Sequence, residues 1–490
     1  MRPRWAILLT WVIAGIAEAT TRREPAGQNL IILLIDGYGA ALLNKTKPES
    51  LIGIQKVADN GVQAEYIRPV FPTHSWPNWL SLVTGLYTEN HGMTADYMWS
   101  QEKKLSFERG SGPNDTDDLW WQGLPAPVWY TAGKKRVDVH CYYFAHCHRV
   151  NGDLIVMVPP ERVMDLSYQD QTADLAEHFA PIVRKISRHQ HKRQQLVLMR
   201  YGNLANAIRE FGEGSDEVEG ELSRIDLHIH DLQKKLEEQK LDESTNLIIV
   251  SDHGLGKVLE EEQYFLEECL SDYSKVTKLV NSHGMVMVFT KPDDEFNIFY
   301  EFKVCEQWAP QGDYDEDEQQ PVVVYRMADI PENLRWAGSR FMSGIVLITR
   351  PGVTVVSREL PSIPAEVSTT VKAVGGWEPD SPEMRGIFLA KGPAFKVNEK
   401  YGPIDMVDVY QVALNILGIE PPHPHNGTWS QIETMLAEGC QTPFGCRQLV
   451  KERWRNYRDE RPNSENAISS RFSVSGLISV VSILLLRLLL

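Results

Sequence analysis

Two continuous apolar segments, each followed by acidic residues, constrain the fold of this chain more than any other feature. They read "NLIILLIDGYG", beginning at Asn29, and "NLIIVSDHG", at 246–254. An apolar run without polar alternation is typical of a strand buried on both faces of a parallel sheet. Open α/β sheets bind their ligands at the carboxyl ends of the strands, so the acidic residues after these two strands can converge in space.

Segments with helical periodicity alternate with these strands. In residues 221–241 the apolar residues recur at three- and four-residue steps, and residues 405–419 form an amphipathic pattern that ends at Gly418. A further apolar run, "RGIFLAKGPAF", begins at Arg385. Alternating strands and helices predict an α/β fold, a doubly wound sheet with helices on both faces.

Both ends of the chain carry patterns of processing signals. Residues 1–19 combine two arginines, a short apolar region and an Ala-Glu-Ala ending, which is typical of a secretory signal peptide. Residues 463–490 combine small residues, a polar spacer and an apolar tail, an order that favours a GPI-anchor signal; a C-terminal transmembrane helix containing Arg487 is the alternative. We therefore expect a protein that is lipid-anchored on the outer face of the plasma membrane.

The composition agrees with an extracellular glycoprotein. Six cysteines are an even number for an oxidising compartment, so up to three disulfides are expected, with their pairing open. Asn-x-Thr sequons predict glycosylation at Asn44, Asn114 and Asn426. The formal net charge of −16 argues against a nucleic acid duplex as partner.

The acidic strand ends predict a metal-assisted site. Asp36, Asp252 and His253 are residue types that a divalent cation prefers as ligands. Ser75, within "PTHSWPNW" at 72–79, could add a hydroxyl that the metal activates for attack on phosphorus. Taken singly, such residues more often cap helices or form turns. The hypothesis therefore rests on the four residues occurring together.

Several segments, in this order, resemble the ectonucleotide pyrophosphatase/phosphodiesterase (ENPP) family: "LLIDGYG", "PVFPTHSWPNWLSLVTGLYTENHGM", "IIVSDHG", "MRGIFLAKGPAFK" and "PIDMVDVYQVALNILGIEPPHPHNGTWS". The resemblance covers residues 28–435, with a C-terminal extension at 436–462. "DYMW" at 96–99, and serine in place of the more usual threonine, resemble the choline-specific glycerophosphodiesterase branch. This resemblance implies an alkaline-phosphatase-like domain with two zinc ions and a Ser or Thr nucleophile.

The resemblance implies that one zinc set is complete and the other is not. The first set falls on Asp36, Ser75, Asp252 and His253, and all four are present. For the second set the family takes an Asp and a His from Asp-x-x-Gly-His-x-x-Gly, but this chain reads "MRYGNLANAIREFGEG". We therefore expect one zinc ion here where the family has two.

The missing second set falls on residues that cannot bind zinc. Its Asp falls on Ala205, its first His on Arg209 and its last His on Gly375. A guanidinium at Arg209 could occupy the vacated position and pair with Asp36 or Asp96.

Asp96 marks a further departure from the family. The family has an Asn there that hydrogen-bonds a phosphoryl oxygen, whereas an ionised carboxylate only accepts hydrogen bonds and repels a phosphodiester.

Other side chains are candidates for replacement metal ligands or for a ligand cage. Asp226 and His230, four residues apart, are interpreted as a partly exposed helix face, and His283 as a loop or strand-edge histidine. A cage for a quaternary ammonium could be formed by Trp76, Trp79, Tyr97 and Trp99, but core packing is the simpler interpretation.

Two function classes follow from these observations. The favoured hypothesis is a catalytically impaired phosphodiesterase-fold protein, or binding pseudoenzyme, that binds a phosphodiester or choline-bearing small molecule. The alternative is an active zinc-dependent phosphodiesterase that hydrolyses choline or nucleotide phosphodiesters through Ser75. A purely structural glycoprotein is a third possibility, and it predicts no bound metal.

Overall fold

The computed structural model describes residues 24–109, 114–115, 117–144, 147, 156–157, 176–260, 262–308, 320–364 and 370–460. The expected signal peptide at 1–19 and the anchor signal at 463–490 lie outside these ranges. Among the described helices, none has both the length and the apolar character needed to span a bilayer.

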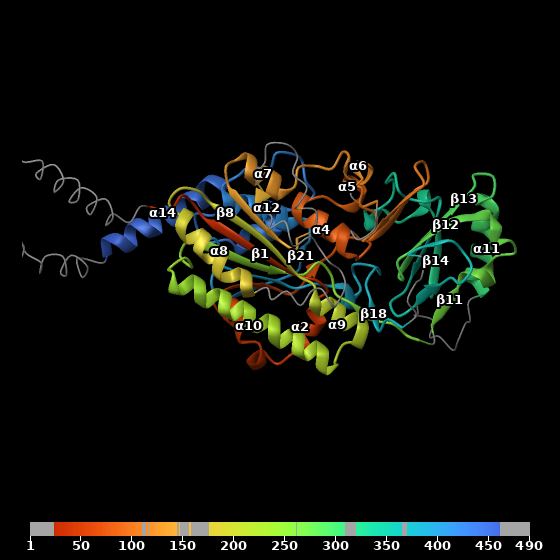
Figure 1. Cartoon of the computed structure of the whole chain (residues 1–490), viewed down its shortest axis with the longest axis horizontal. Helices are drawn as coiled ribbons and strands as arrows, with labels where there is room; N and C mark the ends of the chain where they lie inside the picture. The colour runs from red at the N-terminus through yellow and green to blue at the C-terminus, as the bar shows by residue number, and fades with distance from the viewer. Residues whose placement is uncertain are drawn as a thin grey trace, which may run out of the picture.

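An eight-stranded sheet forms the centre of the molecule (Figure 1). Strand β1 (Asn29–Ile35) lies between β8 (Gln195–Tyr201) and β9 (Thr245–Val250) and is parallel to both, so the two predicted apolar strands are neighbours. The run after Arg385 also forms a strand, β19 (Phe388–Lys391), but it pairs antiparallel with β9. In spatial order the strands are β20 (Glu399–Tyr401), β2 (Gly61–Ala64), β19 (Phe388–Lys391), β9 (Thr245–Val250), β1 (Asn29–Ile35), β8 (Gln195–Tyr201), β6 (Asp138–Tyr142) and β7 (Val156–Met157).

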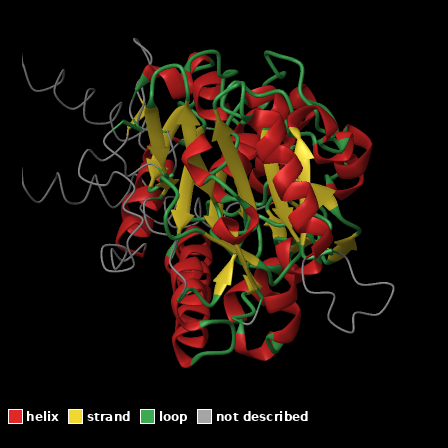
Figure 2. Ribbon diagram, turned by 90° about the vertical axis from the view of Figure 1, so that its right-hand side faces the viewer, coloured by secondary structure: helices red, strands yellow, loops and turns green. Residues whose placement is uncertain are grey.

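Helices cover both faces of this sheet, which confirms the predicted fold class (Figure 2). Leu30, Ile32 and Leu34 of β1 pack into one core, with α4 (Ser75–Thr84), α7 (Val128–Lys134) and α12 (Asp408–Leu417). Ile31, Leu33 and Ile35 pack into the other, with α3 (Ile52–Asp59), α8 (Ala176–His189), α9 (Asn203–Phe211) and α10 (Asp216–Glu238). Burial on both sides explains why the strand is apolar from Leu30 to Ile35.

A second sheet, which the sequence analysis did not predict, forms a smaller lobe beside the first (Figure 1). Its five strands are β14 (Val322–Arg326), β15 (Ile345–Thr349), β13 (Met285–Thr290), β12 (Val276–Asn281) and β17 (Ser362–Ile363). Helix α11 (Glu295–Trp308) packs on one face. The other face buries Trp336, whose ring meets Phe71 at a centroid distance of 5.1 Å. The lobe is thus attached to the loop that precedes Ser75.

Shorter elements and three disulfides complete the described chain. The expectation of three disulfides is confirmed, with the pairs Cys141–Cys147, Cys269–Cys305 and Cys440–Cys446. The remaining helices and strands are α2 (Ala40–Lys45), α5 (Thr88–His91), α6 (Asp118–Trp121), α13 (Trp429–Ile432), α14 (Pro443–Glu460), β3 (Ile67–Arg68), β4 (Tyr97–Ser100), β5 (Leu105–Glu108), β10 (Gly256–Lys257), β11 (Gln263–Phe265), β16 (Thr354–Val356), β18 (Ala373–Val374) and β21 (Ile404–Asp405). Helix α14, in the expected C-terminal extension, packs on α12.

Candidate metal centre

The register of the central sheet brings the acidic strand ends together. Leu34 of β1 pairs with Val250 of β9, and Asp36 and Asp252 each follow two residues later, just beyond the ends of the strands. One ligand atom each of Asp36, Asp252 and His253 lies within 4.8 Å of the others, and all three side chains are buried. The predicted convergence of the two strand ends is therefore observed.

Hydrogen bonds fix the orientation of Asp252 and His253. Asp252 Oδ1 accepts from the backbone N–H groups of Gly37 and His253, each at 3.0 Å, and Oδ2 accepts from Trp79 Nε1 at 2.7 Å. His253 Nδ1 lies 2.7 Å from the Gly254 carbonyl oxygen, to which it donates in the neutral tautomer. The lone pair of His253 then lies on Nε2, 3.6 Å from Asp252 Oδ2, as a metal ligand requires.

Ser75 is the first residue of α4 and points into the same cluster. Its Oγ lies 3.2 Å from His253 Nε2 and 3.5 Å from Asp36 Oδ1, and the residue is fully buried. The four side chains proposed as the first zinc set thus share one site. The zinc ion itself stays a prediction.

Arg200, which the sequence analysis missed, contacts the same cluster. It pairs with Leu34 in the β1–β8 register, and its Nε and Nη2 both contact Asp36 Oδ2, the former at 3.2 Å. Burial alone would raise the pKa of Asp36, but the guanidinium groups of Arg200 and Arg209 outweigh it and hold that pKa well below its usual range. The sequence feature that could have predicted this contact is the single arginine near the end of the apolar run "QLVLMRY", at 195–201.

The residues aligned with the second zinc set lie around this cluster. Arg209 Nη2 is 3.7 Å from Asp36 Oδ1, which is one of the two contacts hypothesised for it, and its Nη1 has no hydrogen-bond partner among the described residues. A Cβ placed on Gly37 would lie 2.9 Å from the Ala205 side chain. A Cβ placed on Gly375 would lie 3.4 Å from the His253 ring.

Asp96 caps the N-terminus of α4. Its Oδ1 accepts the Trp76 backbone N–H at 2.8 Å, and its Oδ2 lies 3.4 Å from Arg109 Nε, a second arginine that the sequence analysis missed. The carboxylate is almost wholly buried. This ion pair therefore occupies the helix end next to Ser75, where backbone N–H groups favour an anion.

The side chains considered as replacement ligands or as a ligand cage do not form part of the candidate metal centre. The prediction that Asp226 is partly exposed is wrong, because its side chain is buried. It caps α3 by accepting hydrogen bonds from the backbone N–H groups of Gly53 and Ile54, at 3.0 and 2.8 Å. His283 lies between β12 and β13, as expected, and burial with neighbouring positive groups lowers its pKa to about 4. Trp76 and Trp79 are buried in the core rather than free to form a cage.

The donor set fits one divalent ion, but two guanidiniums oppose it. His253 Nε2, Asp252 Oδ2, Asp36 Oδ1 and Ser75 Oγ are hard or borderline donors, which suit zinc. Arg200 and Arg209, however, each contact Asp36. No second group of three or more metal-ligating side chains occurs in the described ranges.

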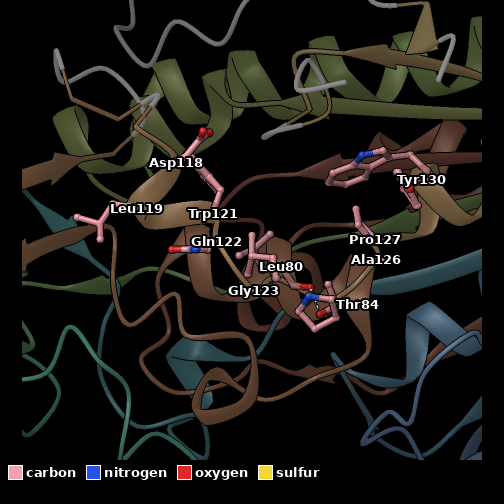
Figure 3. Close-up of a pocket in the computed structure, with 13 residues that line it drawn as sticks. Leu80, Thr84, Asp118, Leu119, Trp121, Gln122, Gly123, Ala126, Pro127 and Tyr130 are labelled. Carbon is pink, nitrogen blue, oxygen red and sulfur yellow. Dashed lines mark hydrogen bonds between the residues drawn. The ribbon is translucent and has the colours of Figure 1, made fainter. Parts of the chain in front are cut away.

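A separate cavity of about 790 Å³ lies along the later part of α4 (Figure 3). Leu80 and Thr84 of that helix line it, together with Trp121, Trp129 and Tyr130. None of the four proposed zinc ligands does. The cavity is thus distinct from the candidate metal centre.

The fold and the cluster define an alkaline-phosphatase-like α/β protein with a serine beside three side chains that could hold a metal ion. The family model for type I phosphodiesterase / nucleotide pyrophosphatase matches residues 30–377, so the chain belongs to this family. Among the solved structures, human ectonucleotide pyrophosphatase / phosphodiesterase 5 (ENPP5) shares the fold with a TM-score of 0.68 at 21% identity, covering 84% of this chain and 100% of that one.

Related proteins are similar to this chain over most of its length. Bis(5'-adenosyl)-triphosphatase ENPP4 from Homo sapiens is 26% identical over 446 residues, covering 88% of this chain and 86% of that protein. The same protein from Pongo abelii is 26% identical over 444 residues, with the same coverage. A further solved structure, at 21% identity and a TM-score of 0.68, is an inactive variant of murine ENPP5 in complex with AMP; it covers 84% of this chain and 100% of that one. Membership of the choline-specific branch stays a prediction.

Proposed function

We propose that this chain is a catalytically impaired ENPP-type protein that binds a phosphorylated small molecule next to Ser75. One observation carries the proposal: the three positions aligned with the second zinc set hold Ala205, Arg209 and Gly375, none of which can ligate a metal. Two ions would together activate the hydroxyl and neutralise charge on the phosphoryl oxygens. Asp36, Ser75, Asp252 and His253 would hold one.

The chain's own residues fit binding better than turnover. His253 Nε2 can accept the Ser75 proton across 3.2 Å, and Arg209 can neutralise part of a phosphoryl charge. Asp96, however, accepts a hydrogen bond from the Trp76 N–H at 2.8 Å, so this backbone donor is not available to stabilise a phosphoryl oxygen. Loss of one oxyanion donor commonly costs ~3 kcal/mol of transition-state stabilisation.

The similar proteins support a nucleotide as the first ligand to test. One is a bis(5'-adenosyl)-triphosphatase, and a structural neighbour was solved in complex with AMP. A choline phosphodiester is the second candidate, on the resemblance of "DYMW". Both would present a phosphoryl group to Ser75.

The extracellular location is part of the same proposal. Asn44 and Asn426 are exposed, as glycosylation requires, and Asn426 Oδ1 accepts the Tyr87 N–H at 3.0 Å, which leaves its amide nitrogen free to carry a glycan. Expression of the full chain in mammalian cells tests this location. Release from the cell surface by phosphatidylinositol-specific phospholipase C supports the GPI anchor, whereas retention favours the transmembrane alternative.

Zinc content and turnover of the released protein test the impaired site. We expect no more than one zinc ion per chain by elemental analysis in saturating zinc, and none in Asp252→Ala. We expect Ser75-dependent hydrolysis of a nucleotide phosphodiester to be absent, or about a hundredfold or more below that of a two-zinc relative. Two zinc ions, or fast hydrolysis abolished in Ser75→Ala, would establish the active enzyme instead.

A further inference from the structure

Arg200 is a buried cation inside a cluster that would otherwise attract a metal. Its side chain is 3% exposed and that of Asp36 is fully buried. Arginine does not deprotonate in proteins, so it needs a counter-ion when it leaves water. In the described part of the chain, Asp36 is the carboxylate with which it forms an ion pair.

Both oxygens of Asp36 lie beside guanidinium groups. Oδ2 is contacted by Nε and Nη2 of Arg200, while Oδ1, the oxygen nearest Ser75 Oγ, is 3.7 Å from Arg209 Nη2. A metal ion at this site would have to share the carboxylate with two positive charges. At such distances the repulsion between a divalent ion and a guanidinium is strong in a buried setting.

The Arg200 side chain is also held by packing. Its guanidinium lies 4.6 Å from the centre of the Trp79 ring, and the nitrogen of that ring donates to Asp252. One arginine therefore contacts Asp36 directly and Asp252 through Trp79. Such a placement holds the two acidic side chains in position without a bridging ion.

With the three neighbouring carboxylates ionised, the formal charges around Ser75 sum to zero without a metal. Arg109, Arg200 and Arg209 contribute three positive charges. The carboxylates of Asp36, Asp96 and Asp252, when ionised, contribute three negative charges. Every divalent ion that binds would leave a buried excess of two positive charges unless an anion or a lost proton accompanied it.

We propose that Arg200 is a resident counter-ion of Asp36 that compensates the acidic cluster without metal and weakens its affinity for zinc. The inference rests on the proposed one-zinc site and concerns its regulation. Binding of a divalent ion then competes with an arginine of the same chain. The folded protein does not depend on zinc.

Substitution of Arg200 by methionine tests the proposal. Arg200→Met removes the charge and keeps an unbranched side chain against Trp79. Arg109→Met is the matched control, because it removes the same charge from an arginine paired with Asp96. Zinc affinity is measured on chelator-stripped full-length protein by competition with a chromophoric chelator. We expect Arg200→Met to bind zinc at least about tenfold tighter than wild type, and the control to change less.

If Arg200 only oriented Asp36 for metal binding, its substitution would weaken zinc binding instead of strengthening it. Outer-sphere partners that position a metal ligand typically cost about 10–100-fold in affinity when removed. Arg200→Met that binds zinc more weakly, equally or not at all therefore overturns the proposal. Stoichiometry at saturation separately tests the one-zinc site, so the two failures are distinguishable.

A second measurement uses the wild-type chain and does not depend on the variant folding. Because a ligand that binds the folded state stabilises it, a site built for tight zinc binding would raise Tm markedly in micromolar zinc. We expect Tm in excess chelator and in micromolar zinc to agree within about 2 °C. A large zinc-dependent rise in Tm overturns the proposal.

Discussion

Trp79 shows how one side chain combines packing with the electrostatics of the site. Its indole is buried in the core, its Nε1 donates to Asp252 Oδ2 at 2.7 Å, and the Arg200 guanidinium lies over its ring. Trp76, on the same helix, is equally buried, but its Nε1 has no partner in the described residues. The two tryptophans therefore differ in the hydrogen bond to Asp252 and in the contact with Arg200.

Replacing each tryptophan by phenylalanine tests the hydrogen bond to Asp252, because phenylalanine keeps an aromatic ring but has no N–H. We expect Trp79→Phe to lower the free energy of unfolding by about 1.5–3 kcal/mol more than Trp76→Phe, because only the former removes the indole donor from the buried Asp252 Oδ2. Urea denaturation followed by circular dichroism measures both variants. Equal losses would show that the Trp79–Asp252 bond contributes nothing to stability.

Among the structural elements, the segment after β18 packs tightly around Gly375, the position at which we predict the last histidine of the second zinc set to be lost. The Gly376 N–H donates to the Thr73 carbonyl at 3.1 Å, so this segment packs backbone against backbone on the loop before α4. An ideal Cβ on Gly375 would lie 2.5 Å from the Thr73 carbonyl oxygen, which is closer than real contacts allow. The backbone packing at this position therefore leaves no room for a side chain on residue 375.

Substitution of Gly375 tests this packing. We expect Gly375→Ala to destabilise the protein by about 1–3 kcal/mol, because the loop must move to admit a methyl group. Gly402→Ala is the control, since nothing lies within 4 Å of a Cβ there, and its effect should stay within about 0.5 kcal/mol. If both variants have wild-type stability in urea, the loop is free to adjust and a histidine at 375 becomes feasible.

At the scale of the whole molecule, the smaller lobe closes one side of the candidate metal centre. His74, the residue before Ser75, lies with its Nε2 3.2 Å from the carbonyl oxygen of Ser282, in the turn between β12 and β13. Phe71 packs on Trp336 of the same lobe. Both contacts tie the Ser75 loop to a lobe that has its own sheet, its own core and the Cys269–Cys305 disulfide.

The disulfides should contribute to stability according to the loops that they close. Cys269–Cys305 spans 36 residues and Cys440–Cys446 spans 6. A longer loop restricts the unfolded chain more, so removing the first pair by double alanine substitution should cost about 4 kcal/mol and removing the second about 2 kcal/mol. Guanidinium denaturation of the two double variants gives the comparison. A reversed order would show that local packing, rather than loop length, sets the contribution.

The sequence predicted those parts of the fold in which local pattern and burial coincide. The apolar runs gave β1 and β9 because both faces of each strand are covered, and the spacing in residues 221–241 gave most of α10. The second sheet was missed because its short apolar strands, such as Met285–Thr290, carry no acidic residue at their ends and resemble any buried segment. Short apolar runs do not distinguish strands from buried helices.

The sequence by itself determined which chemical groups stand at the strand ends: Asp36, Asp252 and His253, with Ser75 opposite. Only the tertiary structure decided how these groups are paired, because Arg200 reaches Asp36 through the register of β1 and β8 rather than through proximity in sequence. Residue types fix the available donors and charges. The sheet register and the burial that it imposes fix which charges must neutralise one another.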